Sequence, residues 1–194
     1  MHGRHLSHLS RLVMILVGAA ALSASGCGGF AIHYKSDTAA AAAPTKGAVT
    51  LKVVDARDPD HGGTVHTHVG NARGGLGIPV RINDQNPDVA PRTIGEATTD
   101  ALARTGLSAK GGPKTLVATI NNYWVDGFVG YACKIAVLYE LQDASGKQLW
   151  TAAVNGGAGG TNIRPAMFEK ALSDLAAHAA EQFASQPFQQ ALAM

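Results

Sequence analysis

Histidine and aspartate side chains gather in one glycine-rich stretch of the sequence, and their chemistry is that of metal ligands. The group comprises Asp58, Asp60, His61, His66 and His68. Imidazole nitrogens together with carboxylate oxygens suit zinc, copper or nickel. If residues 66–68 are extended, His66 and His68 point to the same side of the chain. The spacing fixes no third ligand, so the competing interpretation is a solvated loop whose histidines titrate freely. A metal-binding loop over residues 58–68, using His61, His66 and His68, is the alternative function that this pattern suggests.

A second reactive side chain, that of Cys27, follows a stretch with the composition of a secretory signal. An apolar run covers residues 12–22, behind a short head that carries Arg4 and Arg11. The run is too short to cross a bilayer core of ~30 Å, and it ends on the small residues 24–26 that signal cleavage requires. We expect residues 1–26 to be removed as a signal peptide, which makes Cys27 the first residue of the mature protein.

The small residues followed by cysteine resemble the lipobox of bacterial lipoproteins, with Ala24 where leucine is commonest in that motif. In that family the cysteine sulfur receives a diacylglycerol and the new amino terminus is acylated, so the resemblance implies a lipid anchor with palmitate-type chains at Cys27. Gly28 and Gly29 follow without an aspartate, and by resemblance to proteobacterial lipoproteins this implies an outer-membrane position facing the periplasm. The alternative is an ordinary secretory signal cut near Ala24 or Gly26, which leaves Cys27 a free thiol.

The rest of the chain offers no set of catalytic residues. Cys133 is the one thiol left once Cys27 is acylated, so no internal disulfide can form. It alternates with apolar residues, which predicts a core position where a thiol is unreactive. The sequence contains no Gly-Xaa-Ser-Xaa-Gly motif, and the glycine clusters at 74–77 and 156–160 lack the Gly-Lys-Ser/Thr ending of a phosphate-binding loop. We expect a protein that is not an enzyme and that holds no cofactor.

The charge of the mature chain argues against nucleic acid as a partner. The full sequence has a formal net charge of +2, and Arg4 and Arg11 leave with the signal. The mature protein is therefore neutral and has no basic stripe to neutralise phosphates. Without a polybasic segment, the acyl chains must hold the protein on the membrane.

The first half of the mature chain alternates between extended and irregular patterns. Residues 27–47 have no apolar face, which predicts a lipidated N-terminus followed by a flexible tether. Residues 48–56 alternate with the period of a strand. Residues 57–88 form a long irregular segment, with a short strand where Ile78, Val80 and Ile82 alternate. A helix then runs from about residue 88 or 90. Gly106 is expected to cap its C-terminus.

The second half contains the strongest periodicity. The alternation predicts two long strands, over residues 116–125 and 131–143. A hairpin turn is expected at residues 144–147, followed by a returning antiparallel strand over residues 148–155. The glycines of 156–160 are interpreted as a flexible connection. A helix with a wide apolar stripe then covers residues 165–184.

Together these elements predict an α+β fold in a single globular domain over residues 48–194. Helices on one side of an antiparallel sheet of about four to five strands would bury both apolar stripes. The other sheet face would then look toward solvent or a partner. Because adjacent strand residues point to opposite faces, one of Tyr123 and Trp124 must lie on that open face. Tyr123, Trp124, Lys134 and Glu140 are therefore the candidate partner-binding residues, since aromatic residues are enriched at interface centres.

The order of these elements resembles the YajG-type lipoproteins, an uncharacterised bacterial family. The resemblance is best from Asp126 to Phe183. It rests there on the strand start at Gly130-Tyr131, the Leu141–Gly146–Trp150 hairpin, the glycine-rich exit and the Ala171–Leu172–Leu175 helix. Val53, Asp55 and Arg57 agree more loosely, and residues 57–88 depart from the family. The resemblance implies an envelope location and an unassigned role in binding an envelope protein or cell-wall partner, with no catalytic residue to carry over.

Overall fold

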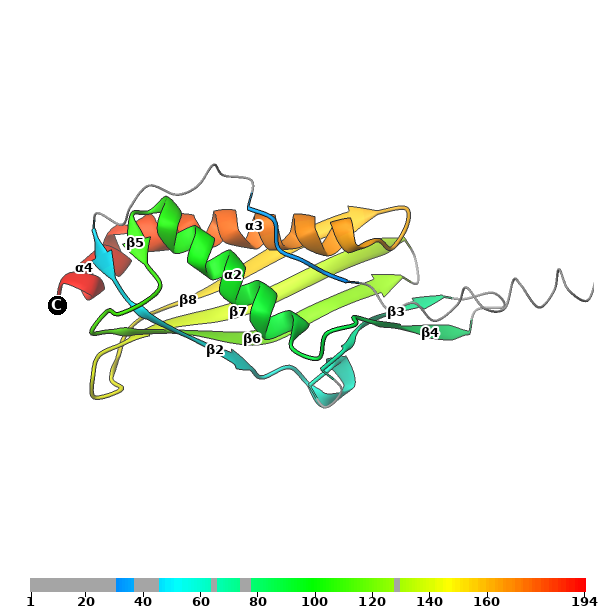
Figure 1. The fold of residues 1–194 in the computed structure, drawn as a ribbon, viewed down its shortest axis with the longest axis horizontal. Coiled ribbons are helices and arrows are strands. Elements are labelled where there is room, and N and C mark those ends of the chain that lie inside the picture. The colour runs from blue at the N-terminus through cyan, green and yellow to red at the C-terminus, as the bar shows by residue number, and fades with distance from the viewer. Residues whose placement is uncertain (1–30, 37–45, 64–65, 74–77, 128–129) are drawn as a thin grey trace, which may run out of the picture.

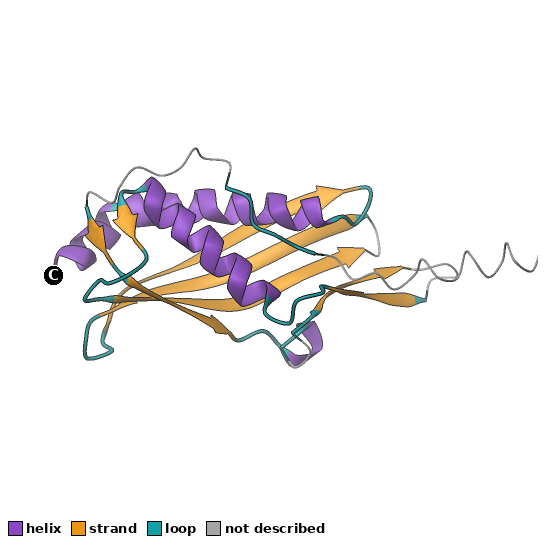
Figure 2. Cartoon of the chain, in the orientation of Figure 1, coloured by secondary structure: helices purple, strands orange, loops and turns teal. Residues whose placement is uncertain are grey.

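A computed structural model describes residues 31–36, 46–63, 66–73, 78–127 and 130–194 (Figure 1). The predicted signal peptide, the lipidation site Cys27 and much of the predicted tether lie outside these residues. The remainder forms an α+β structure in which two long helices lie on one face of a sheet (Figure 2). The predicted fold class is therefore confirmed.

Three long antiparallel strands form most of the sheet, and the last of them lies at one edge. They are β6 (Thr115–Gly127), β7 (Tyr131–Gln142) and β8 (Gln148–Gly160). The β7–β8 turn is the predicted hairpin, because Gly146 takes a positive φ of 83° and Asp143 Oδ1 accepts hydrogen bonds from the amides of Ser145 and Lys147. In β7 the odd-numbered residues from Cys133 to Leu141 are buried, as the alternation predicted.

Two short strands share the outer edge of β6, and both run parallel to it. β2 (Thr50–Asp55) pairs with the first half of β6, and β3 (His68–Arg73) pairs with its last residues. β4 (Pro79–Asn83) pairs antiparallel with β3. The sheet is thus mixed, and the prediction of a purely antiparallel sheet is wrong at this edge. Parallel pairing needs a crossover, which the helix between β4 and β6 supplies.

The helices cover the face opposite the exposed polar side chains. Their bounds are α2 (Val89–Arg104), α3 (Pro165–Ala184) and α4 (Gln186–Ala193). A 3-10 turn, η1 (Pro59–His61), lies at the other side of the sheet (Figure 1). Gly106 follows α2 with a φ of 81°, the left-handed conformation of the predicted cap. After the end of α2, the two-residue strand β5 (Leu107–Ser108) pairs in parallel with β1 (Gly47–Ala48). No helix within the described residues is long and apolar enough to cross a membrane.

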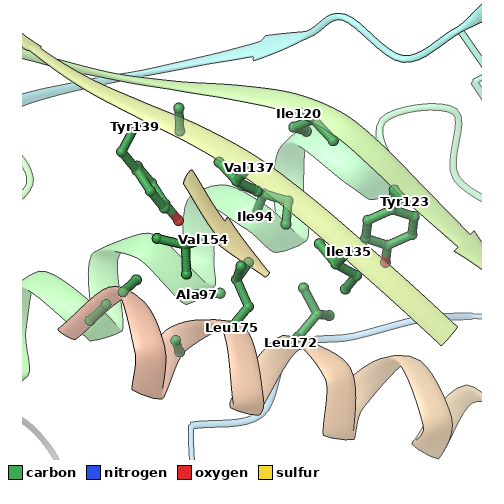
Figure 3. Close-up of a cluster of buried hydrophobic side chains, with 14 of the residues drawn as sticks. Ile94, Ala97, Ile120, Tyr123, Ile135, Val137, Tyr139, Val154, Leu172 and Leu175 are labelled. Carbon is green, nitrogen blue, oxygen red and sulfur yellow. The ribbon is translucent and has the colours of Figure 1, made fainter. Parts of the chain in front are cut away.

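Apolar side chains from the sheet and both helices form one core between them (Figure 3). Each of the two buried tyrosines of this core forms a hydrogen bond with a threonine of α2. A buried hydroxyl needs such a partner. Thr93 Oγ1 donates to Tyr123 Oη at 3.2 Å, and the hydroxyls of Thr98 and Tyr139 lie 2.9 Å apart. Cys133 is also in this core at 1% exposure, and burial raises the pKa of its thiol to about 12. The predicted core position of Cys133 is confirmed.

The glycine-rich segment after Val154 is part of a strand, which corrects the prediction of a flexible connection over residues 156–160. β8 remains paired with β7 as far as the Tyr131–Gly160 pair. A Cβ at Gly156 would overlap the carbonyl oxygen of Ala171 and lie 2.7 Å from Leu175 Cβ. The glycine therefore lets α3 approach the strand backbone, and its role is close packing.

Residues 31–36, which the sequence assigned to the flexible tether, pack along α2 instead. Ile32 is fully buried, its amide donates to Asp84 Oδ2 at 2.7 Å, and its carbonyl accepts from Arg92 Nη2 at 2.7 Å. Tyr34 Oη donates to Asp100 Oδ2 at 2.5 Å. In the sequence, Phe30, Ile32 and Tyr34 alternate over only five residues, a stretch too short to predict docking against a distant helix.

Candidate functional site

The face of the sheet that lacks helices carries most of the predicted partner-binding residues. On β6, Tyr123 points into the core and is fully buried, whereas Trp124 points to the open face. The prediction that Tyr123 contacts a partner is therefore wrong, because its side chain cannot be reached from solvent. Trp124 lies directly opposite Lys134 of β7 in the register, and Lys134 is exposed. Glu140 lies on the same face, nearer the other end of β7.

Two of the loop histidines hold the Trp124 indole. The ring centroids of His61 and Trp124 are 4.8 Å apart with an interplanar angle of 88°, and those of His68 and Trp124 are 4.8 Å apart at 72°. Both are edge-to-face contacts, the arrangement that aromatic rings prefer. His68 is buried, and its Nε2 lies 3.0 Å from the Gly70 carbonyl oxygen and 3.3 Å from Asn71 Oδ1. Because a carbonyl can only accept, Nε2 carries the proton.

A buried ion pair fixes the loop that supplies these histidines. Arg57 donates from Nε to Asp55 Oδ1 at 2.8 Å and from Nη2 to Asp55 Oδ2 at 2.7 Å. Its Nη1 also donates to the His68 carbonyl oxygen at 3.4 Å, which connects the beginning of the loop to its end. Burial on its own would raise the pKa of Asp55, but the hydrogen bonds and charge of Arg57 outweigh it and hold the pKa below its ordinary value. The two ends of the loop, at Arg57 and His68, are therefore held together by a buried side chain that makes a fork-to-fork contact with Asp55.

The same geometry separates the three histidines that the sequence suggested as metal ligands. His66 Nδ1 lies 3.4 Å from Asp55 Oδ2, while His61 and His68 face Trp124. Asp58 Oδ1 accepts from the Asp60 amide at 2.8 Å and so caps η1. In the parts of the chain that the structure describes, no group of three or more His, Cys, Asp or Glu residues could hold a metal ion.

A cavity of about 400 Å³ opens beside the indole on this face. Its lining residues are His61, Asn122, Trp124, Asp126, Gly130, Ala132 and Lys134. The lining thus presents an aromatic ring, an amide, a carboxylate and an ammonium group, a set that suits recognition of a mixed polar and apolar surface. Asn122 and Asp126 were missed in the sequence, although they alternate with Trp124 along one strand and the same period could have found them.

A larger but shallow groove, of about 870 Å³, runs along α2 where residues 31–36 dock. Among its lining residues, Arg92 Nη1 pairs with Glu96 Oε1 at 3.4 Å, and Asp100 Oδ2 pairs with Arg104 Nη2 next to the groove at 2.6 Å. Burial and the hydrogen bond to Asp100 raise the pKa of Tyr34 above its ordinary value. Tyr34 and Ser36 of the N-terminal segment form part of the wall of this groove. The candidate site is placed at Trp124, where the predicted partner-binding residues and the loop histidines meet.

Comparison with known proteins gives similarity of fold. No family model and no curated protein matches the sequence. Protein XCC0632 from Xanthomonas campestris, of the DUF330 family, matches with a TM-score of 0.56 at 14% identity, over 84% of this chain and 96% of that one. The PelC dodecamer from Paraburkholderia phytofirmans matches with a TM-score of 0.43 at 14% identity, over 78% of this chain and 95% of that one.

Lipoprotein GNA1162 from Neisseria meningitidis matches with a TM-score of 0.33 at 13% identity, over 72% of this chain and 99% of that one. The XCC0632 similarity shows that the two chains share a fold. The two lower scores support no further argument. The solved structures that this chain is similar to thus include a DUF330 protein and a bacterial lipoprotein.

Proposed function

We propose that this chain is a lipid-anchored lipoprotein of the bacterial outer membrane, facing the periplasm, and that it works as a non-enzymatic binding or adaptor module. The apolar run at 12–22 and the small residues before Cys27 support the lipid anchor, because they form a signal with lipobox-type cleavage chemistry. The YajG-type resemblance of the sheet and the last helix supports an envelope location.

One observation carries the binding role. Trp124 lies on the sheet face without helices, in edge-to-face contact with two imidazoles and with Lys134 opposite it. Rigid aromatic side chains bordered by charged groups are typical of the energetic centres of protein interfaces. An immobilised ring also loses little conformational entropy when a partner packs on it. The partner we propose is therefore another protein of the envelope, bound at the cavity beside Trp124.

The environments of Cys133 and His68 favour binding over catalysis. The one cysteine of the described residues is in the core with a raised pKa, so it is a poor nucleophile. The buried His68 uses its Nε2 proton on the Gly70 carbonyl oxygen, and its ring supports Trp124. These roles are structural, which favours a surface that recognises a partner.

Photo-crosslinking in living cells tests the proposal. A photoreactive phenylalanine analogue would replace Lys134, which lines the cavity, or Lys170, an exposed lysine on α3 at the opposite side of the sheet. We expect a discrete crosslinked partner from position 134 and none from position 170. The Trp124→Ala change should reduce that product severalfold. In a Cys27→Ser form, which cannot be lipidated, the product should also fall.

Two outcomes would contradict this proposal. Equal and diffuse crosslinking from positions 134 and 170 would refute a specific site on the open face. A crosslink to cell-wall glycan in place of a protein would refute the proposed class of partner. Circular dichroism of each variant must match the wild type before its crosslinks are compared.

A further inference from the structure

In the part of the chain that the structure describes, two large exposed apolar side chains lie at the start of β4, one just before the strand and one within it. Among the described residues, Ile78 is 61% exposed and Val80 is 48% exposed, while Ile82 on the same side of the strand is buried. The β3–β4 pair extends past the part of β3 that pairs with β6, so its outer end projects from the sheet (Figure 1). Neighbouring exposed apolar side chains at the tip of a projecting strand are a candidate for contact with a protein or a membrane.

The predicted lipid attachment lies close to this projecting strand. Ile32 is fixed by its hydrogen bond to Asp84, the residue that follows β4. Cys27 precedes Ile32 by five residues, and five residues span at most ~18 Å in any conformation. The acyl chains must therefore start within that distance of the base of β4. In Figure 1 the described N-terminal segment, in blue, also ends beside β3 and β4.

The distance from Asp84 to the exposed end of β4 is similar to the distance that the five residues before Ile32 can span. From Asp84 back to Ile78 the chain advances six residues, or ~20 Å at the rise of an extended strand. A lipidated Cys27 and the outer end of β4 can thus lie in one plane. Arg81 is also exposed on this strand, and a guanidinium group is compatible with anionic lipid headgroups.

We infer that the outer end of β4 contacts the bilayer, with Ile78 and Val80 in the interfacial region of the membrane. The inference rests on the proposed lipid anchor and adds a second contact to it. Two points of attachment fix the orientation of the domain, whereas acyl chains on a linker alone would leave it free to rotate. The β7–β8 turn, at the opposite end of the sheet, then points away from the membrane (Figure 1).

Site-directed spin labelling of the lipidated protein tests this orientation. A nitroxide would be attached to Ile78→Cys or, as the matched control, to Ser145→Cys in the exposed β7–β8 turn. The native thiols do not compete, since Cys133 is buried and Cys27 would be acylated. The protein would be reconstituted in vesicles of phosphatidylethanolamine and phosphatidylglycerol, and collisions with oxygen and with a water-soluble nickel chelate would be measured.

We expect the ratio of oxygen to nickel collisions at position 78 to exceed that at position 145 severalfold, because oxygen concentrates in lipid and the chelate stays in water. Equal ratios at the two positions, in protein that floats with the vesicles, would overturn the contact while leaving the anchor intact. Protein that fails to float with the vesicles would overturn the proposed anchor and this inference with it.

Discussion

The ion pair of Asp55 with Arg57 should control both the stability of the domain and the position of Trp124. We consider the Asp55→Asn change, which keeps the size of the side chain and removes its charge. The Arg57 side chain is fully buried and that of Asp55 is 8% exposed, so the change leaves a guanidinium charge in the interior without its counter-charge. Breaking a buried pair from one side costs about 3–5 kcal/mol of unfolding free energy.

The pH dependence of this effect follows from the lowered pKa of Asp55. A carboxyl whose pKa is lower in the folded state contributes stability above its unfolded pKa of about 3.9 and loses it as the pH falls through the folded value. The difference between wild type and Asp55→Asn is therefore complete at neutral pH. It should begin to shrink once the pH drops below about 4, because Asp55 of the unfolded chain then binds a proton, and it is lost when the pH falls below the lower pKa of the folded state.

Urea unfolding followed by tryptophan fluorescence measures both quantities, since Trp124 packs against His61 and His68 of the loop that Arg57 holds. The matched control is Asp58→Asn, an exposed carboxylate in the same loop, which should change the unfolding free energy by no more than about 0.5 kcal/mol. If both variants unfold at the same urea concentration at pH 7, the loop is not held by the ion pair and our account of the site is wrong.

Three further predictions concern packing, reactivity and metal. Gly156→Ala should cost about 1–3 kcal/mol, because its Cβ meets the Ala171 carbonyl, and should lower the melting temperature. The control, Gly157→Ala, has only ordinary contacts and should melt like the wild type. Cys133 should react with a thiol reagent only after unfolding, because burial raises its pKa to about 12; rapid reaction of the native protein would contradict a core position. Added zinc or copper should leave the melting temperature unchanged, since no set of three ligands converges among the described residues, and a large upward shift would revive the histidine hypothesis.

The elements of this fold could be predicted from the sequence because their signals are local. In β7 the alternation of apolar residues places Cys133 and its neighbours on one buried face, and the structure agrees. The apolar stripe of α3 and the left-handed Gly106 after α2 follow equally from spacing and residue type. The rule that Tyr123 and Trp124 face opposite ways is also a local property of a strand.

Tertiary structure decided which of those two aromatic residues lies on the open sheet face, because that depends on which face the helices cover. It also decided that β2 and β3 share one edge of β6, since pairing between distant segments depends on the route of the connecting chain. Arg57 in the sequence resembles any loop arginine, and only its burial against Asp55 makes it the support of the histidine loop. The docking of Ile32 also depends on tertiary structure, because its hydrogen-bond partner Asp84 lies fifty-two residues away in the sequence. Sequence patterns give the period of an element and the residues that share a face. Which face is covered, and which distant loop packs on Trp124, depend on contacts such as those of His61 and His68 with Trp124, which lies more than fifty residues further along the chain.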